Sequence, residues 1–462
     1  MHFIGREDEI RLLRKTNFRD HADLTVMYGR RRVGKTALIE KAYHDCVMWK
    51  FEGLEQASPG DQINSFLNQL ALYAPTKKGK TYSANDWGDA FLLLSKTLNN
   101  KKVVVFFDEF QWMVGMDAKI VSLFKYYWDN HFQKHRSCRF VICGSVSSFI
   151  VEQVIHSQAL YGRIDTEIHL KPLSLKESRL FFSARTAEEV LQIYMTFGGV
   201  PKYLLEIEPG RSFLQNLNET AFHQNGFFFQ EYRRLFISHF AENTHYQTIV
   251  RALSQKQATL DDLAKACQTK KGGVFSDHVN NLVLADFVER FIPLGKSDLS
   301  RIVRFRLLDE YLHFYFGFIL PNAARIQSGQ FQYQGINEPT LRQWQGYAFE
   351  RLCRRHAREI AKRLFFAGVA YASGTYFERK KNGVQVDLVF KRNDNVLTVC
   401  EVKYVNTLQG KALVDTFQKK IRTLSESFPR YSIHKVLILG KENKIPDVVK
   451  STFDQIIYAS EI

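Results

Sequence analysis

The sequence has few cysteines and no long apolar run. Its six cysteines occur singly among 462 residues, without the CxxC pairs or close histidines that a structural zinc site requires. This pattern excludes a zinc-stapled fold and predicts reduced, mostly buried thiols. No stretch approaches the about 20 apolar residues of a membrane span, and charged residues begin at Arg6. We therefore expect a soluble, cytoplasmic protein with no membrane partner.

Internal repeats and low-complexity tracts are also absent. Apolar residues make up 45% of the chain, with 38 Phe and 20 Tyr, so wholesale disorder is excluded. At roughly 150 residues per domain, the length predicts about three domains. The chain should therefore be globular and multidomain.

Acidic residues are scarce toward the C-terminal end. Residues 341–462 hold 22 Lys plus Arg against 12 Asp plus Glu, a formal charge of +10 out of +16 for the whole chain. A field of this sign attracts polyanions. It predicts DNA as a partner of this region, with simple solubility as the alternative, and whether the chain forms a homo-oligomer stays open.

A strand, a glycine loop and a helix follow one another near the N-terminus, at 24–28, 29–36 and 37–43. The loop matches GxxxxGK[ST] and consists of Gly29, Arg30, Arg31, Arg32, Val33, Gly34, Lys35 and Thr36. In such a loop backbone N–H groups surround the β-phosphate, the lysine reaches the β- and γ-phosphates, and the hydroxyl binds Mg²⁺. The sequence therefore predicts a P-loop, with ATP and Mg²⁺ as its ligands.

Two further predicted strands end in polar residues. The strand 103–107 is followed by Asp108 and Glu109, and the strand 139–143 is followed shortly by Ser145. Because the carboxyl ends of parallel strands meet at one edge of a sheet, Asp108 is expected beside the P-loop as a Mg²⁺ ligand. Glu109 is then placed to orient the attacking water. Ser145 is a candidate sensor of the γ-phosphate, or else the cap of a turn.

Four motifs together resemble those of the archaeal-type ATPase family, a branch of the AAA+ and STAND P-loop NTPases. They are Phe3-Ile4-Gly5-Arg6-Glu7, the P-loop, Phe107-Asp108-Glu109-Phe110 and Gly198-Gly199-Val200-Pro201. The resemblance covers residues 1 to about 235 and implies an ATPase core with a helical lid. It also implies that Arg163 is an arginine finger for the γ-phosphate; the alternative is an ordinary surface arginine. A third possibility, a motor that remodels DNA or protein, would need a ring of subunits in which Arg163 acts on the neighbouring subunit.

Two predicted strands near the C-terminus bring carboxylates and a lysine together. Asp387 lies in the strand 383–390, and Glu401 and Lys403 share one face of the strand 397–403 because alternate residues of a strand point the same way. Such a set suits the hydrolysis of a phosphodiester: Asp387 and Glu401 would bind Mg²⁺, and Lys403 would position or deprotonate water.

This arrangement resembles the PD-(D/E)XK nuclease superfamily over roughly residues 340–445. The resemblance implies a catalytic role for Glu350 on an upstream helix and an auxiliary role for Gln418 on a later one. Three alternatives stay open: an active DNA nuclease, a DNA-binding relic, and a structural hairpin. The predicted function is thus an ATPase whose nucleotide state controls a nuclease-like domain. The rival is an ATP-gated regulator or defence-type signalling protein with an inert C-terminal domain.

The predicted fold class is α/β: a P-loop NTPase parallel sheet with a helical lid, then a winged helix and a restriction-endonuclease-like α/β domain. Residues 246–294 give the winged-helix prediction, because three short amphipathic helices precede a strand; contact with DNA and simple packing both stay open for them. The predicted domains are the ATPase core at 1–169, the lid at 170–238, the winged helix at 239–324, a linker at 325–340 and the nuclease-like domain at 341–462.

Overall fold

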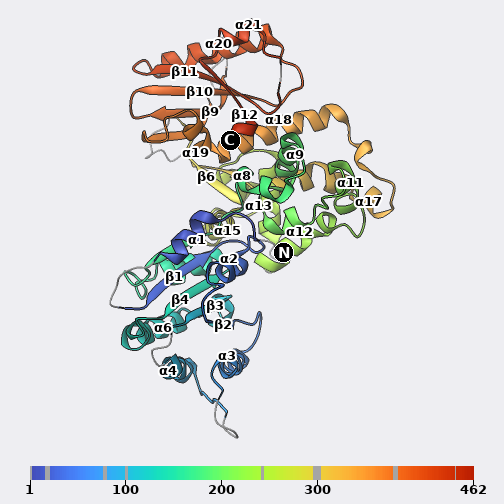
Figure 1. Cartoon of the computed structure of the whole chain (residues 1–462). Coiled ribbons are helices and arrows are strands. Elements are labelled where there is room, and N and C mark those ends of the chain that lie inside the picture. The colour runs from blue at the N-terminus through green and yellow to red at the C-terminus, as the bar shows by residue number, and fades with distance from the viewer. Residues whose placement is uncertain are drawn as a thin grey trace. The chain divides into compact units, whose positions relative to one another are not determined.

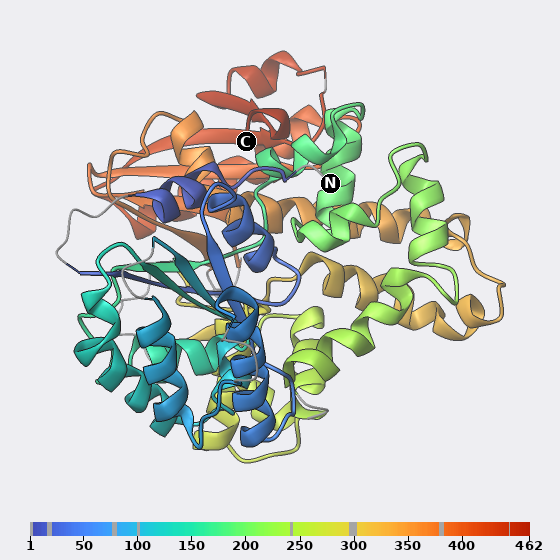
Figure 2. The ribbon, with the colours of Figure 1, turned by 60° about the horizontal axis from the view of Figure 1, so that its bottom comes forward.

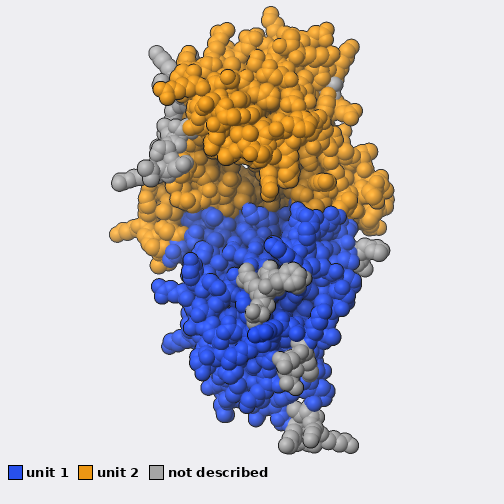
Figure 3. Space-filling view, turned by 60° about the vertical axis from the view of Figure 1, so that its left-hand side comes forward, with its two compact units in different colours: residues 1–173, 237–241, 277–287 blue, residues 174–236, 242–276, 288–462 orange. Residues whose placement is uncertain are grey.

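A computed structural model describes residues 3–15, 21–75, 81–98, 102–240, 244–294, 303–377, 383–442 and 444–462. It divides into two compact units, which Figure 3 colours differently. The N-terminal unit comprises residues 1–173, 237–241 and 277–287, and the C-terminal unit comprises residues 174–236, 242–276 and 288–462. No helix among the described residues is long and apolar enough to cross a bilayer.

The described part of the N-terminal unit is built on a five-stranded parallel sheet (Figure 1). Its strands, in the spatial order β2-β3-β4-β1-β5, are β2 (Met48–Glu52), β3 (Val104–Asp108), β4 (Arg139–Gly144), β1 (Asp23–Tyr28) and β5 (Thr166–His169). Every residue of β3 is buried, as expected of a strand covered on both faces. The parallel sheet predicted from the strands near residues 25, 105 and 141 is confirmed.

Helices cover both faces of this sheet (Figure 2). They are α1 (Glu7–Arg14), α2 (Lys35–Ala42), α3 (Pro59–Tyr73), α4 (Trp87–Leu98), α5 (Phe110–Met113), α6 (Ala118–Asn130) and α7 (Ser147–Phe149), with a π-helical turn η2 (Ile150–Ile155). Alternate strand residues feed two separate cores: Phe107 packs with α3, α4 and α6, whereas Phe106 packs with α1 and α2. Because the helices cover the faces of the sheet, the P-loop can lie at the edge formed by the carboxyl ends of the strands.

The first part of the C-terminal unit is helical. Its elements are α8 (Leu175–Arg179), α9 (Ala187–Phe197), α10 (Pro201–Leu205), α11 (Phe213–Thr220), α12 (Phe227–Phe240), α13 (Thr244–Gln255), α14 (Leu260–Ala266), α16 (Glu310–Phe314) and α17 (Ala323–Gln327). The break predicted at 198–201 is confirmed: α9 stops before Gly198, whose φ of 70° favours glycine, and Pro201 opens α10.

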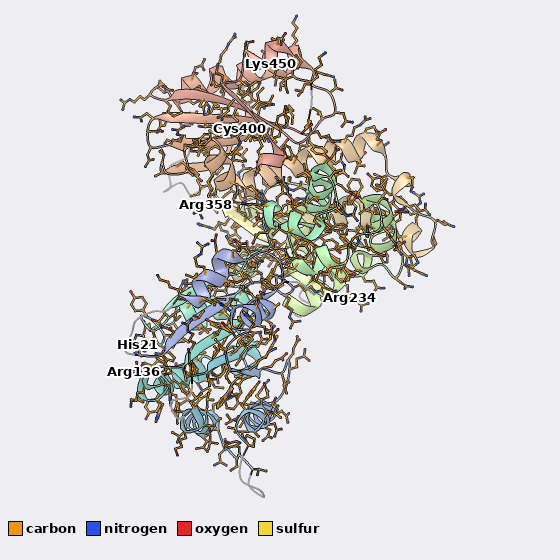
Figure 4. The ribbon with its side chains drawn as sticks, in the orientation of Figure 1. His21, Arg136, Arg234, Arg358, Cys400 and Lys450 are labelled. Atoms are coloured by element: carbon orange, nitrogen blue, oxygen red, sulfur yellow. The ribbon has the colours of Figure 1, made fainter. Side chains whose placement is uncertain are left out.

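The described residues of the last part of the unit form a mixed five-stranded sheet with four α-helices (Figure 1). The strands, in the spatial order β12-β11-β10-β9-β8, are β12 (Gln455–Tyr458), β11 (Ser432–Leu439), β10 (Val396–Lys403), β9 (Gln385–Arg392) and β8 (Tyr371–Phe377). The helices are α18 (Glu338–Arg355), α19 (Ala357–Arg363), α20 (Gly410–Ser427) and α21 (Asp447–Lys450). β8, β9 and β10 are antiparallel, whereas β10, β11 and β12 are parallel. The predicted pairing of the strands that carry Asp387 and Glu401 is confirmed, and Figure 4 shows Cys400 within this sheet.

Two of the predicted domain boundaries differ from the structure. The predicted linker at 325–340 is ordered: α17 ends within it, α18 begins within it, and Phe331 is 3% exposed and packs against Phe222. The linker prediction rested on the absence of hydrophobic periodicity, and one buried aromatic residue in a Gln- and Gly-rich stretch does not produce such periodicity. The helix order predicted for the winged helix is present, with α15 (Gly273–Leu284) followed by the antiparallel pair β6 (Val288–Phe291) and β7 (Arg304–Leu307), but residues 277–287 belong to the N-terminal unit. The winged helix itself stays a prediction.

Candidate nucleotide site and C-terminal carboxylate cluster

The P-loop connects β1 to α2 through two glycines in conformations that side chains disfavour. Gly29 has a φ of 149°, and a Cβ there would lie 2.4 Å from the carbonyl oxygen of Leu170. Gly34 precedes α2 with a φ of 90°. Both positions therefore require glycine for the loop to turn around a phosphate.

The two side chains predicted to hold the phosphates and Mg²⁺ lie in this loop as expected. The Lys35 ammonium donates to the carbonyl oxygens of Gly29 and Arg30, at 2.7 and 3.1 Å. The Thr36 hydroxyl donates to a carboxylate oxygen of Asp108 at 2.9 Å, although 72 residues separate the two in sequence. A hydroxyl and a carboxylate in contact fit Mg²⁺, which proteins hold through one or two such oxygens together with substrate phosphates.

Lys50 is a basic neighbour of this pair that the sequence analysis missed. Its Nζ lies 3.1 Å from the same Asp108 oxygen that Thr36 contacts. Burial opposes its ionisation, but the Asp108 charge raises the pKa of Lys50 above its ordinary value. A charged residue inside a strand whose other face is apolar, as in β2, was the available signal.

Glu109 is held by two donors. Ser145 donates its hydroxyl to Glu109 Oε2 at 2.6 Å, and the amide of Gln111 donates to the same oxygen and to Ser145 Oγ. Gln111 is fully buried, and a Cβ on Gly144 would lie 2.5 Å from its amide oxygen. Both of these hydrogen bonds go to one oxygen of Glu109, Oε2. Gln111 was missed, and its place two residues after the acidic pair was the only signal.

Arg6, from the first motif of the resemblance, is hydrogen-bonded to the backbone of the P-loop. Its guanidinium donates to the carbonyl oxygens of Lys171 at 2.6 Å and Val33 at 3.4 Å, and the residue is 4% exposed. It thus connects the N-terminal segment, the exit of β5 and the phosphate loop.

The segment that directly follows α15 packs at the same edge of the sheet. The Arg30 guanidinium lies 4.6 Å above the ring of Phe287, and His169 Nε2 lies 2.7 Å from a carboxylate oxygen of Asp286. His169 also stacks on Tyr28 at 4.5 Å, and burial together with Glu167 raises the pKa of Tyr28 to about 12. The segment that directly follows α15, for which contact with DNA and simple packing both stay open, therefore lies beside the P-loop.

Arg163 lies at the opposite edge of the sheet from the P-loop. It makes two hydrogen bonds to Asp129, at 2.6 and 2.9 Å. Two residues later, the Asp165 N–H donates to the carbonyl oxygen of Leu24, near the start of β1 rather than its end. The structure therefore does not bring Arg163 to the nucleotide of its own chain, and its action across to a neighbouring subunit stays a prediction.

The C-terminal cluster centres on Glu401, whose side chain is 1% exposed. Lys403 Nζ lies 2.8 Å from its Oε1, and Lys420 Nζ donates to its Oε2 at 2.7 Å. Burial opposes ionisation of Glu401, yet the two ammonium groups hold the pKa of its carboxyl below its ordinary value. Glu401 is thus a buried carboxylate whose negative charge is balanced by two lysines.

The other predicted members converge on the same place. The charge of Asp387 disfavours ionisation of Glu350, and the charge of Glu401 disfavours ionisation of Asp387, so these carboxylates lie close together. Arg354 lies 3.9 Å from Glu350. Burial, and after it the Asp387 charge, raises the pKa of Glu350 to about 7. Burial also raises the pKa of Asp387. The structure therefore assembles all four predicted nuclease residues.

The cluster is poorly suited to the Mg²⁺ ion predicted there, although the predicted residues lie together. Both oxygens of Glu401 already contact ammonium groups. Across the described ranges no group of three or more His, Cys, Asp or Glu side chains is arranged to hold a metal ion. Asp387 and Glu401 in this arrangement do not form a ready Mg²⁺ site.

The auxiliary role predicted for Gln418 on α20 stays a prediction, whereas another residue of this helix contacts the cluster. Gln418 is exposed, whereas Lys420 reaches Glu401. Lys420 lies three residues after the buried Phe417, on the stripe of α20 that packs against the sheet. A lysine on the apolar stripe of an amphipathic helix was the available signal.

A parallel sheet in the order β2-β3-β4-β1-β5, a glycine loop at the end of β1 and an acidic pair at the end of β3 define a P-loop ATPase. Residues 3–207 match the family described as an ATPase domain predominantly from Archaea. This part of the chain is therefore an ATPase domain of the archaeal type. Residues 315–415 match a second family, described as archaeal and bacterial proteins of unknown function.

Several relatives and solved structures are similar to parts of this chain or to most of it. An uncharacterized protein of Methanocaldococcus jannaschii is 28% identical over 447 residues, which cover 96% of this chain and 97% of that protein. The Walker-type ATPase of Pyrococcus abyssi is 17% identical, with a TM-score of 0.48, over 68% of this chain and 96% of that one. The ORC2 protein of Aeropyrum pernix is 14% identical, with a TM-score of 0.41, over 69% and 91%.

Proposed function

We propose that the protein binds and hydrolyses Mg²⁺-ATP at the P-loop and that its nucleotide state controls a nuclease-like C-terminal domain acting on DNA. The observation that carries the ATPase half is the 2.9 Å contact between Thr36 and Asp108. It supports a shared cation between the loop and β3, where the nucleotide's phosphates would lie.

The residues around the loop have distinct roles in this proposal. Backbone N–H groups of the loop bind the phosphate oxygens, and Lys35 exchanges its two carbonyl partners for the β- and γ-phosphates. Mg²⁺, when bound with the nucleotide, neutralises part of the phosphate charge. Glu109 orients the attacking water with the oxygen that Ser145 and Gln111 leave unused.

Titration calorimetry with Mg²⁺-ATP tests the ATPase half. Lys35→Ala is expected to weaken binding at least about 100-fold, because each charge-assisted hydrogen bond contributes about 1.5–3 kcal/mol and 1.4 kcal/mol is tenfold. Lys41→Ala, an exposed lysine of the same helix α2, is the matched control and should bind as the parent does. A parent protein that takes up no Mg²⁺-dependent adenine nucleotide would remove the whole proposal.

The nuclease half is supported by the buried convergence of Asp387, Glu350, Glu401 and Lys403. The order of α18, three antiparallel strands, α20 and a parallel strand also supports the likeness to PD-(D/E)XK nucleases. The rival, an inert DNA- or partner-binding domain, is favoured by the two lysines that already neutralise Glu401.

A nuclease assay on linear, supercoiled and branched DNA, with Mg²⁺ or Mn²⁺ and with or without ATP, separates the two versions. We expect Asp387→Asn to cut at least about 100-fold more slowly than the parent, because Asp387 would be a ligand of a catalytic cation that contributes several kcal/mol and about 1.4 kcal/mol is tenfold. The exposed Asp415→Asn on α20 is the control. If the parent hydrolyses ATP but cuts none of these forms, the inert version replaces the nuclease.

A further inference from the structure

The C-terminal end of α19 has an unusual residue at a position that favours glycine. The Phe365 N–H donates to the carbonyl oxygen of Lys362 at 3.1 Å, and the Phe366 N–H donates to that of Ala361 at 3.0 Å. These two bonds are the Schellman motif, which places the residue after the cap in the left-handed region. Phe365 accordingly has a φ of 61°, where a bulky side chain is rare.

The Phe365 side chain buries little surface on folding, so packing does not offset the cost of its backbone conformation. It is 85% exposed, the largest exposure among the large apolar side chains of the described residues. Phe366, the next residue, supplies the hydrophobic contact of the motif and is 2% exposed. A glycine at 365 would therefore serve the helix end better, so the ring has another use.

Two basic side chains lie on one face of α19, and Phe365 lies two residues beyond the last residue of the helix, Arg363. Arg358 and Lys362 are exposed, four residues apart, and Phe365 follows Lys362 by three (Figure 4 labels Arg358). The spacing of four aligns Arg358 and Lys362 along one side of the helix, toward the end where Phe365 is exposed. Neither cation is in an ion pair within the part of the chain that the structure describes, and Glu359 is rotated by about 100° around the helix.

We propose that Arg358, Lys362 and Phe365 bind single-stranded DNA, with the two cations on the phosphate backbone and the ring stacked on an unpaired base. Single strands are held by this combination of a cationic track and an exposed aromatic ring. The inference rests on the proposed DNA partner of the C-terminal domain and assigns that partner a surface. The basic excess of residues 341–462 supplies the long-range attraction.

Phe365→Gly in the full-length protein gives the sharpest test, because two measurements should move in opposite directions. Fluorescence anisotropy with a labelled single-stranded oligonucleotide should show binding about 5- to 150-fold weaker, the loss of one stacked base. The midpoint of thermal unfolding should rise, because glycine adopts the left-handed conformation freely. A lower midpoint would show that the ring stabilises the fold, and would overturn the proposal.

The salt dependence of binding tests the two cations. Replacing both Arg358 and Lys362 with alanine should reduce the slope of log K against log salt by about 1.4, which is about 0.7 for each phosphate of a single strand. Lys450→Ala is the matched control, since this exposed lysine of the same unit pairs with Asp447 (Figure 4). An unchanged slope in the double variant would contradict the proposal.

The remaining outcomes separate this surface from the proposed function. If the parent binds DNA and the Phe365 and Arg358/Lys362 variants bind it equally well, the DNA partner stands and this surface is wrong. If the parent binds no DNA, both are wrong. If instead the variants lose binding to vesicles of phosphatidylserine and phosphatidylcholine while DNA binding is unchanged, the surface binds a membrane and the proposal is overturned.

Discussion

Replacing Glu109 with glutamine is expected to lower kcat for ATP hydrolysis by about 10²- to 10⁴-fold while ATP still binds. Glutamine keeps the size of the side chain and an oxygen that can accept from Ser145, which contacts Glu109 at 2.6 Å. It loses only the negative charge that draws a proton from water. Steady-state kinetics and calorimetric ATP affinity, measured side by side, check the separation of hydrolysis from binding.

The control for this variant is Glu40→Gln, an exposed glutamate on α2 immediately beyond the P-loop. Its kcat and ATP affinity should equal those of the parent. A fall of less than about threefold in Glu109→Gln would show that another group orients the water. A parallel loss of ATP affinity would show instead that the substitution disturbs the loop or the Asp108 carboxylate.

The phosphate loop could be predicted because its requirements are local. A left-handed glycine, a lysine and a hydroxyl at fixed spacing are visible in eight consecutive residues, and the structure places Gly34, Lys35 and Thr36 as expected. Asp108 was predictable for a related reason, because the end of a parallel strand fixes where its next side chain emerges. Both predictions can be made from a few consecutive residues of the sequence.

Partners that come from other elements could not be predicted in this way. Lys50 reaches Asp108 from a neighbouring strand, and its role depends on the pairing of β2 with β3. Lys420 reaches Glu401 only because α20 lies against β10, whereas Gln418, two residues earlier, points to solvent. Such contacts depend on register and on the rotation of a helix, which periodicity constrains only to within a residue or two.

The assignment of α15 shows a further limit. Its place in the order of three helices and a wing left contact with DNA and simple packing both open, and Asp286 and Phe287, just after its last residue Leu284, contact His169 and Arg30 in the N-terminal unit. A contact between segments more than 100 residues apart leaves no trace in local periodicity. The segment immediately after α15 therefore lies beside the P-loop.

Replacing Arg351 with methionine is expected to lower the free energy of unfolding by about 3–5 kcal/mol, because it leaves the buried Glu310 without its counter-charge. Arg351 donates twice to one oxygen of Glu310, at 3.1 and 2.9 Å, and the two side chains are 13% and 3% exposed. Burial raises the pKa of Glu310, and Arg351 opposes that rise. Urea unfolding at neutral pH measures the loss.

The pH dependence and two further variants identify the cause of that loss. Without Arg351 the folded pKa of Glu310 rises further, so the penalty is present at neutral pH and should shrink as the pH falls toward the ordinary glutamate pKa of about 4. Adding Glu310→Gln should recover part of the stability, since no buried charge remains. Arg342→Met on the same helix loses only the exposed partner Glu338 at 3.4 Å, and should cost less than about 1 kcal/mol. Equal losses for Arg342→Met and Arg351→Met would show that α18 depends on its arginine side chains generally, rather than on a buried ion pair.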